Sequence, residues 1–239
     1  MLNPFSTLND DDKFHTDQKR TWTFLLERQM RRSLRFFLLL ICLLSFIHNL
    51  SIAQNKYRNT QQQPEAIMDT IGVKEGMVIG EAGAGEGYFT FWLSKRVGET
   101  GKIYANDIKQ NVLDKIKKRC VRDSVTNITT VLGKQNDPLF PEGKLDMVVM
   151  MLAFHEFKDH AKWLKNVKPS MKPDARLVII ERDPEKINGG WDHFMRNGEI
   201  LDTVKKANFE LVRIETFLKN DNIFIFRLPD DDRKNCTGK

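Results

Sequence analysis

Three glycines at alternate positions, directly behind an acidic residue, are the part of this sequence best suited to chemistry. Glu81 closes a short apolar run, Gly83, Gly85 and Gly87 follow, and an aromatic segment that suits a helix spans residues 88–97. A strand, a glycine loop and a helix in this order bring backbone N–H groups close to a ligand. Glycine permits positive φ angles and places no Cβ between backbone and ligand. The spacing G-x-G-x-G differs from the G-x-G-x-x-G of dinucleotide-binding loops, which disfavours a nicotinamide dinucleotide.

A second acidic residue ends the next predicted strand. Asp107 closes the segment Lys102–Asp107 and lies 20 residues beyond Gly87. Ligands of open α/β sheets lie beyond the carboxyl ends of the strands, where a carboxylate accepts hydrogen bonds from a ribose diol. Asp107 therefore suits ribose binding. Aspartate is also a favoured N-cap for a helix starting near Ile108, and the two roles are compatible.

Histidine and glutamate follow a further predicted strand. His155 and Glu156 come shortly after the apolar run Leu145–Met151, and His193 follows a glycine-rich stretch further along the chain. Imidazole has an unperturbed pKa near 6.5 and readily acts as a general base. Simpler roles stay open, because His155 could cap the next helix with Glu156 in solvent, and His193 could lie in a packed surface loop. All three are kept as candidate catalytic residues.

Alternating apolar and amphipathic segments must position these candidates. The predicted strands are Met77–Ala82, Lys102–Asp107, Ile128–Leu132, Leu145–Met151, Arg176–Glu181, Leu211–Phe217 and Ile223–Phe226. Helices are predicted at 64–71, 88–97, 109–121 and 158–171, with a weakly helical link at 134–142. This alternation predicts a parallel sheet with helices on both faces. The linker Leu218–Asn222 is too short for a crossover, so the last two strands should form an antiparallel hairpin.

Several segments, in this order, resemble the class I S-adenosylmethionine (SAM) dependent methyltransferases related to the ubiquinone/menaquinone-type enzymes. They are Gly80–Gly87, Gly101–Asp107, the stretch 133–148 and Val167–Ile179. The resemblance covers residues 76–226. It implies a Rossmann-like three-layer α/β/α sandwich, whose seven-stranded, mostly parallel sheet ends in an antiparallel hairpin. It also implies SAM as the cofactor.

The same resemblance gives the SAM-binding candidates their roles. It implies that the glycine loop, with Glu81, Gly83, Ala84 and Gly85, shapes the pocket for the methionine moiety. Asp107 and Ile108 are expected to hold the ribose and the adenine edge.

The sequence departs from the family at the adenine end. Family members often carry an acid directly after the glycine of the third strand, where this chain has Lys134 after Gly133. Gln135, Asn136 or Asp137 could take that contact, and Asn136 and Asp137 are the better placed by spacing. On the other side of the cofactor, the resemblance places His155 and Glu156 beside the SAM methyl group and His193 at the acceptor pocket.

The first part of the chain has the features of a leader. From Met30, several arginines precede the apolar run Phe36–Ile47, and small residues precede a cut before Gln54, as in a secretory signal peptide. A membrane anchor is the alternative. We expect 1–29 to be a disordered or misannotated extension, 30–53 a signal peptide or membrane anchor, and 54–239 the methyltransferase domain. The expected location is periplasmic or membrane-anchored, or cytoplasmic if the leader does not function.

Composition narrows the range of functions. The chain has 239 residues, a net charge of +6 and 41% hydrophobic residues, typical of a globular protein with dispersed positive charge, and no nucleic-acid partner is expected. Its three cysteines have no metal-ligand spacing, so no metal is expected. The leading prediction is methyl transfer from SAM to an unidentified small-molecule acceptor. The alternative is an exported or membrane-tethered SAM- or nucleoside-binding protein without turnover. The sequence leaves the oligomeric state open.

Overall fold

The computed structural model describes residues 57–187 and 193–235, together with a few isolated positions before residue 57. The chain divides into two compact units, Met1–Arg58 and Asn59–Lys239, and the fold described below is that of the second. Most residues of the predicted extension 1–29 and of the predicted leader 30–53 lie outside the described part of the chain, so both stay predictions. Among the residues that are described, no helix is both long and apolar enough to cross a membrane.

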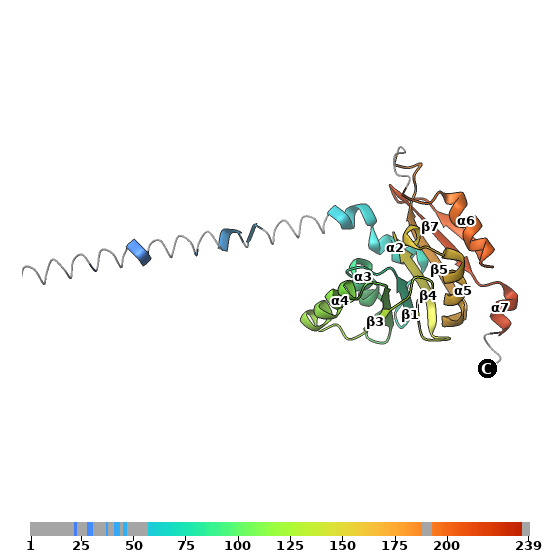
Figure 1. The fold of residues 1–239 in the computed structure, drawn as a ribbon, viewed down its shortest axis with the longest axis horizontal. Helices are drawn as coiled ribbons and strands as arrows, with labels where there is room; N and C mark the ends of the chain where they lie inside the picture. The colour runs from blue at the N-terminus through green and yellow to red at the C-terminus, as the bar shows by residue number, and fades with distance from the viewer. Residues whose placement is uncertain are drawn as a thin grey trace, which may run out of the picture. The chain divides into compact units, whose positions relative to one another are not determined.

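A seven-stranded sheet in the order β3-β2-β1-β4-β5-β7-β6 forms the centre of this unit (Figure 1). Its strands are β1 Val78–Ala82, β2 Lys102–Asp107, β3 Ile128–Leu132, β4 Leu145–Met151, β5 Met171–Arg182, β6 Glu210–Glu215 and β7 Asp221–Arg227. The pairs among β1 to β5 are parallel, whereas β7 runs antiparallel to both β5 and β6. This arrangement confirms the predicted fold class, including the antiparallel C-terminal hairpin.

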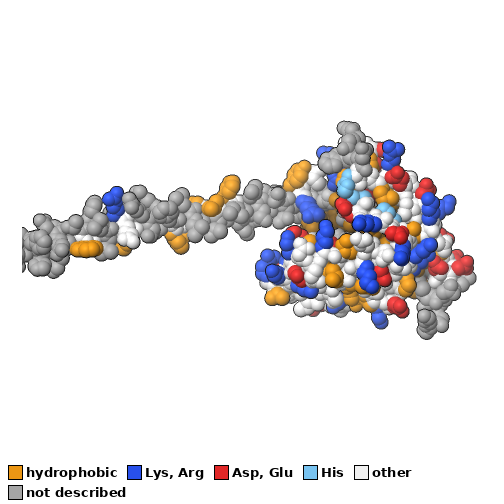
Figure 2. All heavy atoms as spheres, in the orientation of Figure 1, with side chains coloured by type: hydrophobic (Ala, Val, Ile, Leu, Met, Phe, Trp, Pro, Cys, Tyr) orange, Lys and Arg blue, Asp and Glu red, His pale blue; other side chains and the backbone are white. Residues whose placement is uncertain are grey.

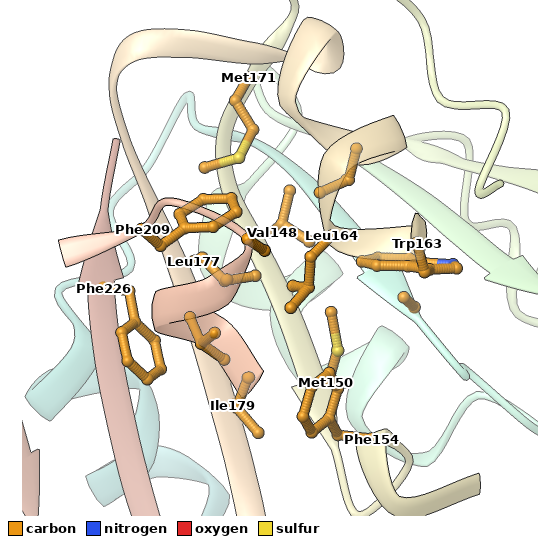
Figure 3. Close-up of a cluster of buried hydrophobic side chains, with 14 of the residues drawn as sticks. Val148, Met150, Phe154, Trp163, Leu164, Met171, Leu177, Ile179, Phe209 and Phe226 are labelled. Carbon is orange, nitrogen blue, oxygen red and sulfur yellow. The ribbon is translucent and has the colours of Figure 1, made fainter. Parts of the chain in front are cut away.

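Helices cover both faces of the sheet and bury two large apolar cores. The helices are α2 Pro64–Ile71, α3 Tyr88–Val97, α4 Gln110–Asp123, α5 His160–Val167, α6 Asn197–Lys206 and α7 Asp230–Asn235. One core lies between the sheet and α2 and α3, and the other between the sheet and α5 and α6 (Figure 3). Helix α4 covers a smaller buried cluster with Ala84 and Ala105. Because both faces are covered, β4 is apolar along almost its whole length instead of alternating.

Two predicted helical segments end differently in the structure. The helix predicted at 158–171 spans only His160–Val167, a 3₁₀ turn follows at Lys168–Ser170, and β5 already begins at Met171. Pro169 explains the early end, since proline lacks an N–H donor and disfavours helix in the residue before it. The predicted link 134–142 contains no helix, only a turn closed by a bridge between Lys134 and Asp137. Its prolines again remove backbone donors.

Candidate active site

A cavity of about 410 Å³ lies at the carboxyl ends of the first four strands. It is lined by Gly83, Asn106, Asp107, Ile108, Lys109, Lys134, Gln135, Leu152, Ala153, Glu156, Phe157, Lys158 and Trp163. β1 is at its centre, with β2 on one side and β4 on the other. The chain order reverses between β1 and β4, and such switch points are where open α/β sheets bind ligands. The volume lies in the range of small-molecule sites.

The glycine loop forms one wall and needs glycine for a steric reason. Gly83 has φ 72°, and a Cβ built there would lie 2.4 Å from the Cβ of Ala153, which follows β4. The loop is fastened to β2, because Ala84 N–H donates to the Asn106 carbonyl at 2.9 Å. Gly87, with φ 86°, occupies the N-cap position of α3. The close approach of loop and β4 segment thus depends on a missing side chain.

Asp107, the last residue of β2, holds the glycine loop through a hydrogen bond. Its Oδ2 accepts from Gly85 N–H at 3.0 Å and its Oδ1 from Lys109 N–H at 2.9 Å. A carboxylate oxygen accepts two hydrogen bonds, so these contacts still leave capacity for a ligand hydroxyl on each oxygen. Helix α4 starts at Gln110, and Lys109 occupies the N-cap position. Asp107 therefore faces the cavity instead of capping the helix. Ile108 beside it is half exposed and also lines the cavity.

The other predicted SAM-binding residues lie behind the cavity wall. Glu81 is buried in β1, where it accepts a hydrogen bond from the Thr90 hydroxyl of α3. Ala84 packs against Leu113 and Ile116 of α4. Neither residue, nor Gly85, is among those that line the cavity. They support the loop, and the structure brings only Gly83, Asp107 and Ile108 of this group to the cavity surface.

After β3, the residues that line the cavity come directly before Asn136 and Asp137, the pair predicted from the sequence. Lys134 and Gln135 face the cavity, whereas Asn136 and Asp137 do not. The Asp137 carboxylate accepts from Leu139 N–H at 3.0 Å, and the Asn136 carbonyl accepts from the Asn166 amide at 2.8 Å. The hydrogen bond to Leu139 holds the Asp137 side chain within the turn, and the Asn136 backbone is tied to α5.

Asn106, which sequence reasoning missed, fixes this turn in place. Its buried amide donates to the carbonyls of Val131 at 3.2 Å and Pro138 at 2.8 Å. A Cβ at Gly133 would lie only 2.4 Å from that amide nitrogen. Glycine at position 133 therefore makes room for the amide that ties β3 and its turn to β2. The one sequence signal for this role was that Asn106 is a polar residue directly before Asp107, the last residue of β2.

The segment after β4 forms the opposite wall. Leu152 lines the cavity with φ 53°, a conformation that is uncommon for a non-glycine residue and often marks functional sites. Phe154 is fully buried and packs beside Met150 of β4 (Figure 3). It anchors the 3₁₀ turn Phe154–Glu156. Phe157 and Trp163, with ring centroids 5.0 Å apart, add an aromatic surface.

The three candidate catalytic residues meet at the edge of this wall, and histidine side chains are visible among acidic and apolar groups in Figure 2. The Glu156 Oε1 atom lies 3.5 Å from His155 Nε2 and 3.2 Å from His193 Nε2. The His155 side chain is only 5% exposed, and its Nδ1 lies 2.9 Å from Oε2 of the fully buried Glu181. That contact has ion-pair distance but not the direction of a good hydrogen bond. Only Glu156 of the three lines the cavity itself.

A fourth histidine supports the turn from behind. His160 Nε2 donates to the Phe154 carbonyl at 2.9 Å, which requires the Nε2-protonated tautomer. Burial lowers the pKa of His160 below its usual value, and the hydrogen bond to Phe154 only partly offsets this. The N-cap of α5 is Asp159, which accepts from Lys162 N–H at 3.0 Å. His155 therefore does not cap this helix.

The chain is similar in sequence to known methyltransferases. The chain matches the ubiE/COQ5 methyltransferase family over residues 51–192, more than half of its length. It is 30% identical over 114 residues to a demethylmenaquinone methyltransferase of Lactococcus lactis subsp. lactis, covering 48% of this chain and 45% of that protein. A ubiquinone/menaquinone biosynthesis C-methyltransferase of Escherichia coli O1:K1 / APEC is 28% identical over 116 residues, covering 48% of this chain and 46% of the relative. The chain thus spans about half the length of these curated relatives.

Solved structures match over a larger share. A SAM-dependent methyltransferase from Aquifex aeolicus has a TM-score of 0.67 and 25% identity, covering 73% of this chain and 96% of that one. The geranyl diphosphate C-methyltransferase of Streptomyces coelicolor A3(2) has a TM-score of 0.60 at 13% identity, covers 72% of this chain and 82% of that one, and shows the shared fold. Fold, cavity and family match agree. The chain belongs to the ubiE/COQ5 methyltransferase family.

Proposed function

We propose that this chain binds SAM in the cavity and transfers its methyl group to a small-molecule acceptor. The observation that carries the proposal is the position of Asp107, whose carboxylate faces a cavity at the switch point of the sheet, next to the glycine loop. Family membership and the fold of the Aquifex aeolicus methyltransferase support the same assignment.

The lining residues suit the parts of SAM. Asp107 accepts hydrogen bonds from the two ribose hydroxyls with the capacity that its backbone contacts leave. Gly83 lets the methionine part approach the backbone closely. Ile108 and Gln135 flank the adenine, and Gln135 takes the polar contact for which the sequence offered Gln135, Asn136 or Asp137. The positions of these side chains in the cavity lining support the proposed roles.

The acceptor binds on the side of β4. Its nucleophilic atom attacks the sulfonium methyl group, the C–S bond breaks, and S-adenosylhomocysteine leaves while the acceptor loses a proton. Such a transfer depends mainly on in-line positioning. Phe157 and Trp163 offer a surface for a flat, apolar acceptor, and Glu156 is the cavity-lining member of the group that can take the proton. His155 and His193 lie 3.5 and 3.2 Å from Glu156 Oε1 and hold this carboxylate in place.

The relatives indicate which acceptor to test first. Their names specify methylation of demethylmenaquinone and a C-methylation in ubiquinone/menaquinone biosynthesis. We propose a ring carbon of a demethylated quinol as the first candidate, which fits the aromatic wall.

The test is transfer of label from methyl-labelled SAM. The full chain is incubated with labelled SAM and a demethylated quinol, and in parallel with phenol, amine and carboxylate acceptors. At a limiting SAM concentration, label should appear in one acceptor class, should fall about 10- to 100-fold in Asp107→Ala, and should be unchanged in Lys118→Ala, an exposed position on α4. Tight SAM binding without label in any acceptor would favour the non-catalytic binding protein instead.

A further inference from the structure

We infer that His155, Glu156 and His193 form a site for one divalent transition-metal ion at the acceptor end of the cavity. Their ligand atoms all lie within 4.8 Å of one another. Two imidazoles and one carboxylate are a donor set that zinc and non-haem iron use in proteins. No sequence motif predicts this site, because His193 comes 37 positions after Glu156 and only the fold brings them together.

The distances match metal coordination. Two ligands at about 2.0–2.1 Å from a tetrahedral zinc ion lie about 3.3 Å apart. Glu156 Oε1 is 3.2 Å from His193 Nε2 and 3.5 Å from His155 Nε2. Both distances from Glu156 fit this spacing, and the ligand nitrogens of the two histidines lie within 4.8 Å of each other, so the inferred ion requires at most a rotation of the imidazole side chains.

Glu181 prepares His155 for this role. Its carboxylate has no exposed surface, and its Oε2 lies 2.9 Å from His155 Nδ1. Backbone N–H groups of His155 and Arg182 donate to the two oxygens, at 3.2 and 3.0 Å. In many zinc sites the second ring nitrogen of a ligating histidine donates to a carboxylate, which orients the imidazole. Glu181 lies at ion-pair distance from His155 Nδ1 but off the direction of a good hydrogen bond, so a small rotation of the ring on metal binding would complete this contact. His155 Nε2 is the nitrogen that faces Glu156.

The surroundings favour a cation and allow it to enter. Glu156 and Glu181 bring two negative charges, and neutral imidazoles contribute none. The Phe194 ring packs edge-on against both histidines, with centroids 4.7 and 5.3 Å away, and shields one side. Glu156 and His193 are more than half exposed, so the ion can reach the site from solvent.

The metal site also restricts the chemical class of the methyl acceptor. Because Glu156 lines the cavity, a metal held by three protein ligands has an open position there for an oxygen of the substrate. This consequence rests on the proposed function, and it points to an acceptor that carries a hydroxyl or carbonyl oxygen next to the methylated atom. The metal site itself does not depend on methyl transfer.

Metal titration of the full chain tests the inference. The protein is stripped with a chelator, dialysed, and titrated with Co²⁺ followed by visible absorption and with Zn²⁺ followed by calorimetry. The wild type should bind one ion with ligand-field absorption of a nitrogen/oxygen site. His193→Ala and Glu156→Gln should lose that ion, and His160→Gln, a nearby histidine outside the group, should retain it. Glu181→Gln should weaken Zn²⁺ binding about 10- to 100-fold.

The outcomes separate this inference from the proposed function. Circular dichroism checks that each variant is folded, and SAM calorimetry is run on the same stripped protein. Equal Co²⁺ and Zn²⁺ titrations for wild type, His193→Ala and Glu156→Gln would overturn the metal site, whatever SAM does. In that case the three side chains form only a surface ion-pair group. SAM binding that fails while the ion binds would overturn the proposed function and leave the metal site standing.

Discussion

Replacing Gly83 by alanine should destabilise the fold far more than the same change at Gly85. Both residues have positive φ, 72° and 54°, so each alanine costs about 1–2 kcal/mol of backbone strain. Only at Gly83 would the new Cβ meet a neighbour, the Ala153 Cβ at 2.4 Å, whereas nothing lies within 4 Å at Gly85. Overpacking of this kind adds about 1–3 kcal/mol. The expected loss is therefore about 2–5 kcal/mol for Gly83→Ala and about 1–2 kcal/mol for Gly85→Ala.

A double-mutant cycle isolates the contact. Ala153→Gly removes the opposing methyl group, so in the double variant Gly83→Ala/Ala153→Gly about 1–3 kcal/mol of the loss should return as interaction energy. Urea unfolding of the four proteins gives the free energies of unfolding. Equal losses for Gly83→Ala and Gly85→Ala, or additive effects in the double variant, would show that the loop and the β4 segment do not touch as described.

Three further predictions concern the cavity and its support. Asp107→Ala should weaken SAM binding about 10- to 100-fold by calorimetry, because charge-assisted hydrogen bonds are worth about 1.5–3 kcal/mol, and an unchanged affinity would remove Asp107 from the site. Gln135→Ala should weaken SAM binding more than Asn136→Ala, since only Gln135 lines the cavity; the reverse order would restore the sequence-based assignment. Burial lowers the pKa of folded His160 below the unfolded value of 6.5, so its contribution to stability is present above pH 6.5 and is lost as the pH falls through the folded pKa. Chemical unfolding between pH 8 and pH 5 should therefore show a shallower decline in His160→Gln, and identical slopes would contradict the burial of this imidazole.

The fold could be predicted well because its signals are local. Apolar runs separated by glycine loops and amphipathic segments marked all seven strands, and the short linker before Ile223 required an antiparallel pair. The helix predictions were wrong where proline interrupted a helical pattern. Pro169 ended α5 before the apolar pattern did, and prolines kept 134–142 out of a helix.

The candidate site could be predicted only in part, because side-chain direction depends on contacts that are distant in sequence. Asp107 was recognised from its place at a strand end. Asn136 and Asp137 were favoured by spacing, but the Asp137 side chain is used within the turn after β3, the Asn136 carbonyl binds Asn166 of α5, and Gln135 lines the cavity. Glu181 reaches His155 across 26 positions, through adjacent strands β4 and β5. No local sequence pattern predicts such a contact.

Calorimetry of the wild-type chain with SAM and, separately, with NAD tests most directly whether the cavity binds SAM. We expect saturable heat with SAM at one site per chain and none with NAD, because the cavity combines a G-x-G-x-G loop with Asp107 at the end of β2. Heat with NAD and none with SAM would contradict the proposed SAM site.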